Sequence, residues 1–75
     1  MHNSGTSRGS TTRLESIGNL VGTWRRFGVV GPVYEIVSIG QELAEGDRLM
    51  RVRIVETGEE VDYHLRDILD DPKER

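Results

Sequence analysis

The stretch Arg48–Leu65, RLMRVRIVETGEEVDYHL, decides the fold, because two runs of alternating apolar and polar residues flank the pair Thr57-Gly58. Such alternation is typical of half-buried strands, and this pair suits a two-residue hairpin turn that needs positive φ. A turn centred on the pair places Glu56 opposite Glu59. A three-residue turn with a bulge is the alternative.

The two-residue turn predicts a register that separates the faces of the hairpin. One face is apolar, with these opposing pairs: Ile54 and Val61, Val52 and Tyr63, Met50 and Leu65. The other face is charged, with Arg53 opposite Asp62 and Arg51 opposite His64. The apolar face is expected to cover the core.

Two further strands and a short helix surround this hairpin. Enrichment in β-formers predicts strands over Leu20–Phe27 and Val33–Ile39, and the glycines and acids of Gly40–Asp47 predict a loop. Apolar residues at helical spacing predict a single helical turn over Leu65–Leu69. The segment Asp70–Pro72 ends it, because the residue before a proline disfavours the α region.

The predicted fold class is mostly β: a small SH3-like barrel, or a strongly curved antiparallel sheet of about four to five strands, with a terminal one-turn helix. The β domain is predicted to span residues 20–72. Residues 1–19 are predicted to form a flexible tail, in which a capping box at Thr12–Glu15 favours a short helix. Residues 73–75 are predicted to fray.

Length and composition narrow the classes of function. The chain has 75 residues and no cysteine, which leaves room for one domain and excludes disulfides and thiolate ligands. The net charge is −3, but residues 1–27 carry four arginines and one glutamate, whereas residues 28–75 carry six basic and twelve acidic groups. Any anionic partner is therefore expected at the front of the chain. Without a membrane-spanning or signal segment, we expect a cytoplasmic protein.

No set of catalytic or metal-binding residues can be assembled from the sequence. The two histidines, His2 and His64, have no evident nucleophile beside them. The acidic loop with Glu42, Glu45 and Asp47 lacks the regular alternation of a calcium loop. We therefore expect no enzymatic activity, no catalytic or metal site and no cofactor.

The most distinctive string is Trp24-Arg25-Arg26-Phe27, which holds the only Trp and the only Phe. On a strand, Trp24 and Arg26 share one face while Arg25 and Phe27 share the other. One aromatic residue is then expected in the core and the other outside beside an arginine, where it can contact a base or a partner side chain. An aromatic groove results if Tyr34 or Tyr63 lies near Trp24, so the predicted binding residues are Trp24, Arg25, Arg26, Phe27, Tyr34 and Tyr63.

Residues Gly22–Pro72 resemble a family of short bacterial proteins known as a domain of unknown function. Four motifs carry the resemblance: GTWRRFG from Gly22, GPVYE from Gly31, VETGEEVDY from Val55 and ILDDP from Ile68. The resemblance implies an SH3-like module of bacterial or phage origin, and it implies no catalytic residue.

Together these observations predict a non-enzymatic adaptor or regulator, similar to an inhibitor or antitoxin, that binds another protein. The acidic back half favours a basic protein partner, and a homodimer is a further expectation. No membrane association is expected. The alternative is a nucleic-acid binding module, in which Arg25 and Arg26 meet phosphates while Trp24 or Phe27 stacks on a base.

Overall fold

The computed structural model describes residues 16–74 and contains one antiparallel sheet of five strands. The strands are β1 (Trp24–Arg26), β2 (Val33–Glu42), β3 (Arg48–Ile54), β4 (Glu60–His64) and β5 (Lys73–Glu74). Their order in the sheet is β4-β3-β2-β1-β5, so the sheet is open and β4 and β5 are its edges. A 3₁₀ turn, η1 (Ala44–Gly46), links β2 to β3, and helix α2 (Leu65–Asp70) follows β4. The predicted small β domain with a short terminal helix is confirmed.

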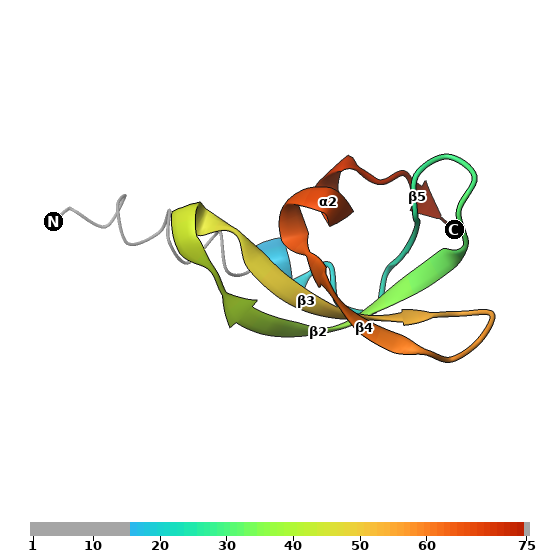
Figure 1. The fold of residues 1–75 in the computed structure, drawn as a ribbon, viewed down its shortest axis with the longest axis horizontal. Coiled ribbons are helices and arrows are strands. Elements are labelled where there is room, and N and C mark those ends of the chain that lie inside the picture. Colours follow the sequence, from blue (N-terminus) through green and yellow to red (C-terminus); the bar gives the residue numbers. More distant parts are fainter. Residues whose placement is uncertain (1–15, 75) are drawn as a thin grey trace, which may run out of the picture.

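The core lies between α2 and one face of the sheet (Figure 1). Its six buried apolar residues come in pairs from β2, β3 and α2: Tyr34 and Ile36, Met50 and Val52, Leu65 and Ile68. The alternation of β2 and β3 supplies the first four because every second side chain of a strand faces the same side. In α2 a spacing of three residues puts Leu65 and Ile68 on the face that meets the sheet.

The β3–β4 hairpin keeps the predicted faces, but its predicted register is wrong by two residues. Val52 lies opposite Val61, and Met50 lies opposite Tyr63. The loop has four residues, 55–58, because the Ile54 amide donates to the Glu59 carbonyl at 2.8 Å, and the Gly58 amide donates to the Ile54 carbonyl at 2.7 Å. Gly58 has the expected positive φ, 78°.

The observed register gives Arg51 and Arg53 of β3 acidic partners on β4. Arg51 lies 3.3 Å from Asp62 and Arg53 lies 3.3 Å from Glu60. In the predicted register Arg51 met His64 instead, and two glutamates faced each other at the tip. The longer loop removes that repulsion without exchanging the two faces, because a shift of two residues preserves the alternation.

The chain before β1 departs from the predicted strand over Leu20–Phe27. Residues 16–18 are helical, and the next residues form successive turns, with the Leu20 amide donating to the Ile17 carbonyl and the Thr23 amide donating to the Leu20 carbonyl. Gly22, at φ 90°, turns the chain into β1. The β-formers of this stretch are therefore only partly used in the sheet. The predicted tail and the capping box at 12–15 lie largely outside the described residues.

The second strand is longer than predicted, and two residues of the segment predicted to fray, 73–75, form a strand, while residue 75 lies outside the described residues. β2 continues to Glu42, with register shifts between Ile36 and Ser38 and between Ile39 and Glu42. Lys73 and Glu74 form β5 against β1. The free edge of β1 accounts for this pairing, because an unpaired strand offers hydrogen-bonding groups that a second strand satisfies.

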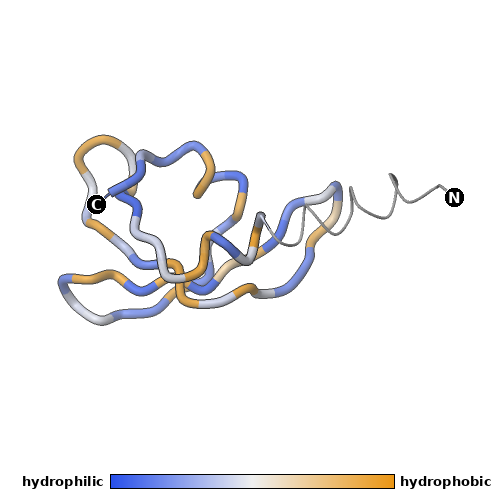
Figure 2. Tube along the Cα trace, turned by 180° about the vertical axis from the view of Figure 1, so that it is seen from behind, coloured by the Kyte–Doolittle hydropathy of each residue, from blue (hydrophilic) through white to orange (hydrophobic). Residues whose placement is uncertain are grey.

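The loop between β1 and β2 is an exposed apolar tip. Figure 2 shows this hydrophobic loop close to the C-terminal end of the chain. Val29 and Val30 are 86% and 93% exposed, so they contribute little to the core. No helix of the described residues is long and apolar enough to cross a membrane.

Candidate functional site

Three of the six predicted binding residues form an aromatic cluster inside the fold. The Phe27 ring centroid lies 4.3 Å from that of Tyr34 and 5.0 Å from that of Tyr63, and the two tyrosine rings lie 5.6 Å apart. The tyrosines thus gather around Phe27, and the ring contacts do not include Trp24. Tyr34 is fully buried, so this cluster is part of the core.

Asp71, directly after α2, connects this cluster to β1. Its Oδ2 accepts hydrogen bonds from the hydroxyls of Tyr34, at 2.8 Å, and Tyr63, at 3.0 Å. Its Oδ1 accepts the Gly28 amide at 3.1 Å, and its carbonyl accepts Arg25 Nη1 at 2.9 Å. Burial, and then the Asp71 carboxylate, raise the pKa of Tyr63 to about 12 and raise that of Tyr34 further. Both phenols therefore remain protonated hydrogen-bond donors.

The two arginines of β1 have different environments, as the alternation predicts. Arg25 faces inward with Phe27 and is only 6% exposed. Arg26 lies on the other face, where its Nη2 is 3.2 Å from the Glu74 carboxylate and its Nη1 donates to the Gly31 carbonyl at 3.1 Å. Trp24 shares the outer face and is 41% exposed. The predicted binding patch is therefore reduced to Trp24 and a partly neutralised Arg26.

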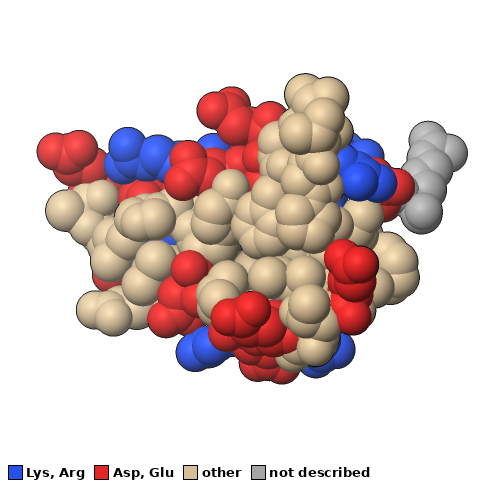
Figure 3. All heavy atoms as spheres, turned by 45° about the vertical axis from the view of Figure 1, so that its right-hand side comes forward, with Lys and Arg blue, Asp and Glu red and all other residues tan. Residues whose placement is uncertain are grey.

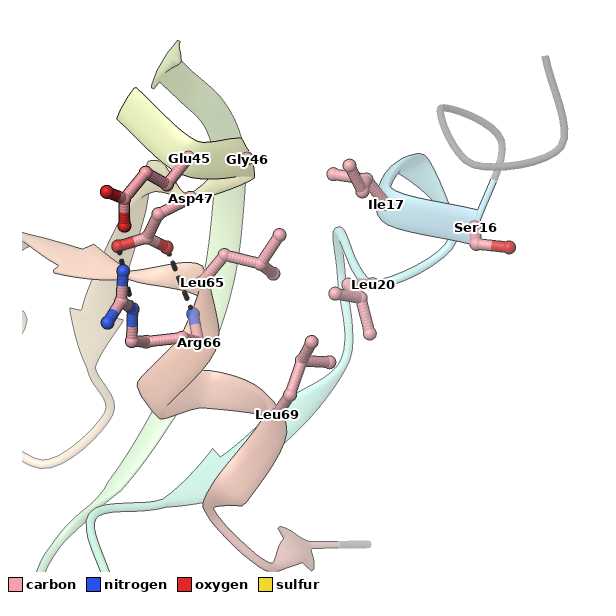
Figure 4. Close-up of a pocket in the computed structure, with 9 residues that line it drawn as sticks. All are labelled: Ser16, Ile17, Leu20, Glu45, Gly46, Asp47, Leu65, Arg66 and Leu69. Carbon is pink, nitrogen blue, oxygen red and sulfur yellow. Dashed lines mark hydrogen bonds and ion pairs between the residues drawn. The ribbon is translucent and has the colours of Figure 1, made fainter. Parts of the chain in front are cut away.

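An apolar groove lies away from this patch, between the turn before β1 and α2 (Figure 4). Four apolar side chains point into it, and they come from residues 16–20 and from α2: Ile17, Leu20, Leu65 and Leu69. The groove has a volume of about 500 Å³. Leu69 is 58% exposed, whereas its helix neighbour Leu65 is buried against the core. The groove thus presents apolar surface that no other part of residues 16–74 covers.

A charged network borders the groove on the side of η1. Asp47 is buried, and its Oδ2 lies 2.6 Å from His64 Nδ1 and 3.2 Å from Arg66 Nε. The hydrogen bond with His64 is the main cause that lowers the pKa of Asp47 to about 2, aided by the backbone amides of Arg48 and Arg66. This network fixes the start of α2 against η1.

The pair of His64 and Asp47 has the geometry of a histidine oriented by a carboxylate. A hydrolytic site also needs a hydroxyl or thiol next to that histidine. Within residues 16–74, no serine or threonine hydroxyl hydrogen-bonds to His64. That same part of the chain has no group of three side chains able to hold a metal ion.

Sequence reasoning missed the groove because its walls come from segments about 50 residues apart. The helical spacing of Leu65, Ile68 and Leu69 was a signal, since only two of the three face the core. Ile17 and Leu20, assigned to a tail and to a strand, gave no sign that they would meet the helix. Only the tertiary fold brings the two apolar edges together.

The comparisons with known proteins assign a family but no activity. A model of a family of unknown function, DUF5397, matches residues 10–75. The chain belongs to this family. The match begins before the described residues and includes both walls of the groove. A search of curated proteins found no match.

Proposed function

We propose that this member of DUF5397 is a non-enzymatic protein-binding module that accepts an apolar segment of a partner protein in the groove between residues 16–20 and α2. The observation that carries the proposal is the exposure of Leu69 beside Leu65, Ile17 and Leu20 in a hollow of about 500 Å³. Concave apolar surface of this size on a small domain is typical of a binding site.

The charge around the groove favours a partner segment with basic flanks. Glu45 lines the groove, and no ion pair with it is formed among residues 16–74. Asp67 and Asp70 are exposed on α2. Figure 3 shows another side of the molecule, on which acidic groups, with some basic ones, lie around an area of uncharged side chains. Apolar anchors with flanking Lys or Arg would satisfy both features.

The proposal also includes the sequence predictions of an SH3-like fold, a bacterial or phage origin, a cytoplasmic adaptor role and a homodimer. The linear strand order, with a helix between β4 and β5, supports an SH3-like barrel that is open on one side. An adaptor or regulator of bacterial or phage origin that acts in the cytoplasm is consistent with such a module. A homodimer would be the special case in which a second copy supplies the apolar segment.

The nucleic-acid alternative has less support. The two arginines proposed to meet phosphates lie on opposite faces of β1, where Arg25 faces inward and Arg26 is paired with Glu74, so they do not form one surface for a nucleic-acid backbone. Phe27, proposed as a stacking residue, packs on Tyr34. Binding that disappears after nuclease treatment would favour this alternative over a protein partner.

The test compares two single substitutions at exposed apolar positions. Leu69→Asp places a charge in the groove, while Val30→Asp places the same charge on the exposed loop between β1 and β2. Proteins retained from a nuclease-treated host lysate by the wild type are identified, and the purified partner is titrated against each variant. We expect Leu69→Asp to weaken binding at least about tenfold and Val30→Asp to leave it nearly unchanged.

Thermal melts of the two variants serve as the folding control, since both side chains are exposed in the wild type. Equal affinity of Leu69→Asp and the wild type for the partner would contradict the proposal. A loss confined to Val30→Asp would move the site to the loop. Glu45→Lys tests the basic flank, and it is expected to slow association at low salt.

A further inference from the structure

A second hollow, of about 340 Å³, lies where β1 pairs with β5, away from the apolar groove. The residues that define its chemistry are Asn19, Trp24, Arg25, Lys73 and Glu74. They come from the turn before β1, from β1 itself and from the last strand of the chain. The hollow therefore exists only because the C-terminal residues form β5.

Two cationic residues are register partners in this strand pair. Arg25 and Lys73 are direct partners in the antiparallel pairing of β1 with β5, and both line the hollow. Directly opposed residues place their side chains on the same face of a sheet, where like charges repel. Lys73 is the only lysine of the chain. Two positively charged residues thus lie side by side in a chain whose net charge is −3.

No acidic side chain of the described residues forms an ion pair with either cation. Arg25 is 6% exposed, yet it meets Asp71 only through the backbone carbonyl, and its buried Nε has no hydrogen-bond partner within residues 16–74. The Asp71 carboxylate is already engaged by Tyr34 and Tyr63. Glu74, at the rim, pairs with Arg26. Buried charges are normally paired, and within residues 16–74 this guanidinium has no carboxylate as an ion-pair partner.

We propose that this hollow binds a phosphate group between Arg25 and Lys73. A phosphate carries about −1.5 to −2 charges at neutral pH, which matches two facing cations better than a single carboxylate does. The Asn19 side-chain amide makes no hydrogen bond in the described structure and can add a donor. Trp24 also lines the hollow, although its side chain leaves β1 on the opposite face from that of Arg25, so a base stacked on the indole would lie at the edge of the hollow.

The position of the only tryptophan makes the site directly measurable. Trp24 lines the hollow, so its fluorescence is expected to change when a phosphate binds. The full chain is titrated with inorganic phosphate, and separately with adenosine monophosphate, at constant ionic strength maintained with sodium chloride. We expect a saturable change in emission with both ligands. Tighter binding of the nucleotide would assign the base to Trp24, and equal binding would assign the site to phosphate alone.

Charge-matched variants separate the site from general electrostatic attraction. Lys73→Gln is expected to weaken phosphate binding about tenfold, because it removes a charge-assisted contact. Arg51→Gln removes a positive charge from the outer face of β3, where Arg51 pairs with Asp62, and it is expected to leave the affinity unchanged. No saturable change with either ligand, or the same affinity in Lys73→Gln and wild type, would overturn the proposal.

Thermal stability supplies a second readout that does not depend on the indole. A ligand that binds only the folded state raises the melting temperature. Phosphate is therefore expected to raise the Tm of the wild type above that in sodium chloride of equal ionic strength, and to raise that of Lys73→Gln much less. An equal rise in both proteins would show that phosphate acts as a general stabilising salt. This test is independent of the protein-binding groove, since Lys73 does not line it.

Discussion

Asp71 is the residue on which the contact between α2, β1 and the aromatic cluster depends. Its substitution by alanine leaves the hydroxyls of buried Tyr34 and half-buried Tyr63 without their acceptor. An unsatisfied buried polar group costs about 1–3 kcal/mol. We expect Asp71→Ala to lower the free energy of unfolding in urea by about 2–4 kcal/mol.

The neighbouring Asp70 provides a matched control, because it is exposed and no hydrogen bond to its side chain is formed within residues 16–74. Asp70→Ala is expected to change the free energy of unfolding by less than about 0.5 kcal/mol. Equal effects of the two substitutions would show that the tyrosine hydroxyls do not depend on Asp71.

Asp47 makes the stability of the protein sensitive to acid. Its pKa falls from 3.8 to about 2 on folding, mainly through the hydrogen bond with His64. A lowered pKa in the folded state means that the unfolded chain takes up the proton first, so the stability from Asp47 is present above pH 4 and declines between about pH 4 and 2. In Asp47→Asn this decline is expected to be shallower, as measured by urea unfolding at several pH values.

The control for that pH dependence is Asp62→Asn, which removes an exposed carboxylate paired with Arg51. Exposed ion pairs contribute little to stability, so the stability of Asp62→Asn is expected to decline at acid pH as that of the wild type does. If the stability of Asp47→Asn declines between about pH 4 and 2 as steeply as that of the wild type, other carboxylates cause the pH dependence.

The sequence predicts residue environments where a local pattern determines them. Alternation in β1 correctly puts Trp24 on the opposite face from Arg25 and Phe27, but only the structure shows that Arg25 and Phe27 face inward. The role of Asp71 was not predictable, because its partners lie 37 and 8 residues away and no local pattern links them. Asp70-Asp71-Pro72 was interpreted only as the end of a helix. Hydrogen-bond networks of this kind follow from tertiary packing.

The β3–β4 hairpin likewise has features that the local pattern predicts and features that it does not predict. The period of two along each strand predicts which side chains face the core, and this prediction is confirmed. The predicted loop length was wrong, because Thr57-Gly58 fits more than one turn; in the observed register Arg51 and Arg53 each lie next to an acidic side chain. Turn chemistry alone cannot separate registers that differ by two residues, since both keep the same faces.

Gly58 tests the observed loop. It has φ 78°, and a Cβ added there meets no atom within 4 Å, so strain in the left-handed region is the only direct cost of a side chain. We expect Gly58→Ala to destabilise the protein by about 1 kcal/mol. Gly18 also has open space but no positive φ, so Gly18→Ala is expected to be neutral or slightly stabilising. Urea unfolding of both variants measures the difference, and equal effects would contradict the loop geometry.

For the whole molecule, the sequence predicts the class of fold but not how the ends of the chain complete it. The alternating strands and the short helix give a mostly β domain, as observed. β5 has only two residues, too few for a periodic signal, yet it pairs with β1 and forms one wall of the hollow proposed to bind phosphate. Likewise, Ile17 and Leu20 pack against the core although their stretch has no sustained period.

Two truncations test which part of the N-terminal region belongs to the domain. Removing residues 1–9 deletes only sequence outside the family match, and every described core contact is retained. We expect the Tm to stay nearly unchanged, as the predicted tail requires.

Removing residues 1–20 also deletes Ile17 and Leu20, whose partial burial is worth about 2–3 kcal/mol in total, and is expected to lower the Tm clearly. Because these side chains also line the apolar groove, the longer truncation should lose the protein partner while the shorter one retains it. An equal fall in Tm for both truncations would show that residues 1–9 contribute to the folded domain, and a partner retained by the longer truncation would place its site outside the groove.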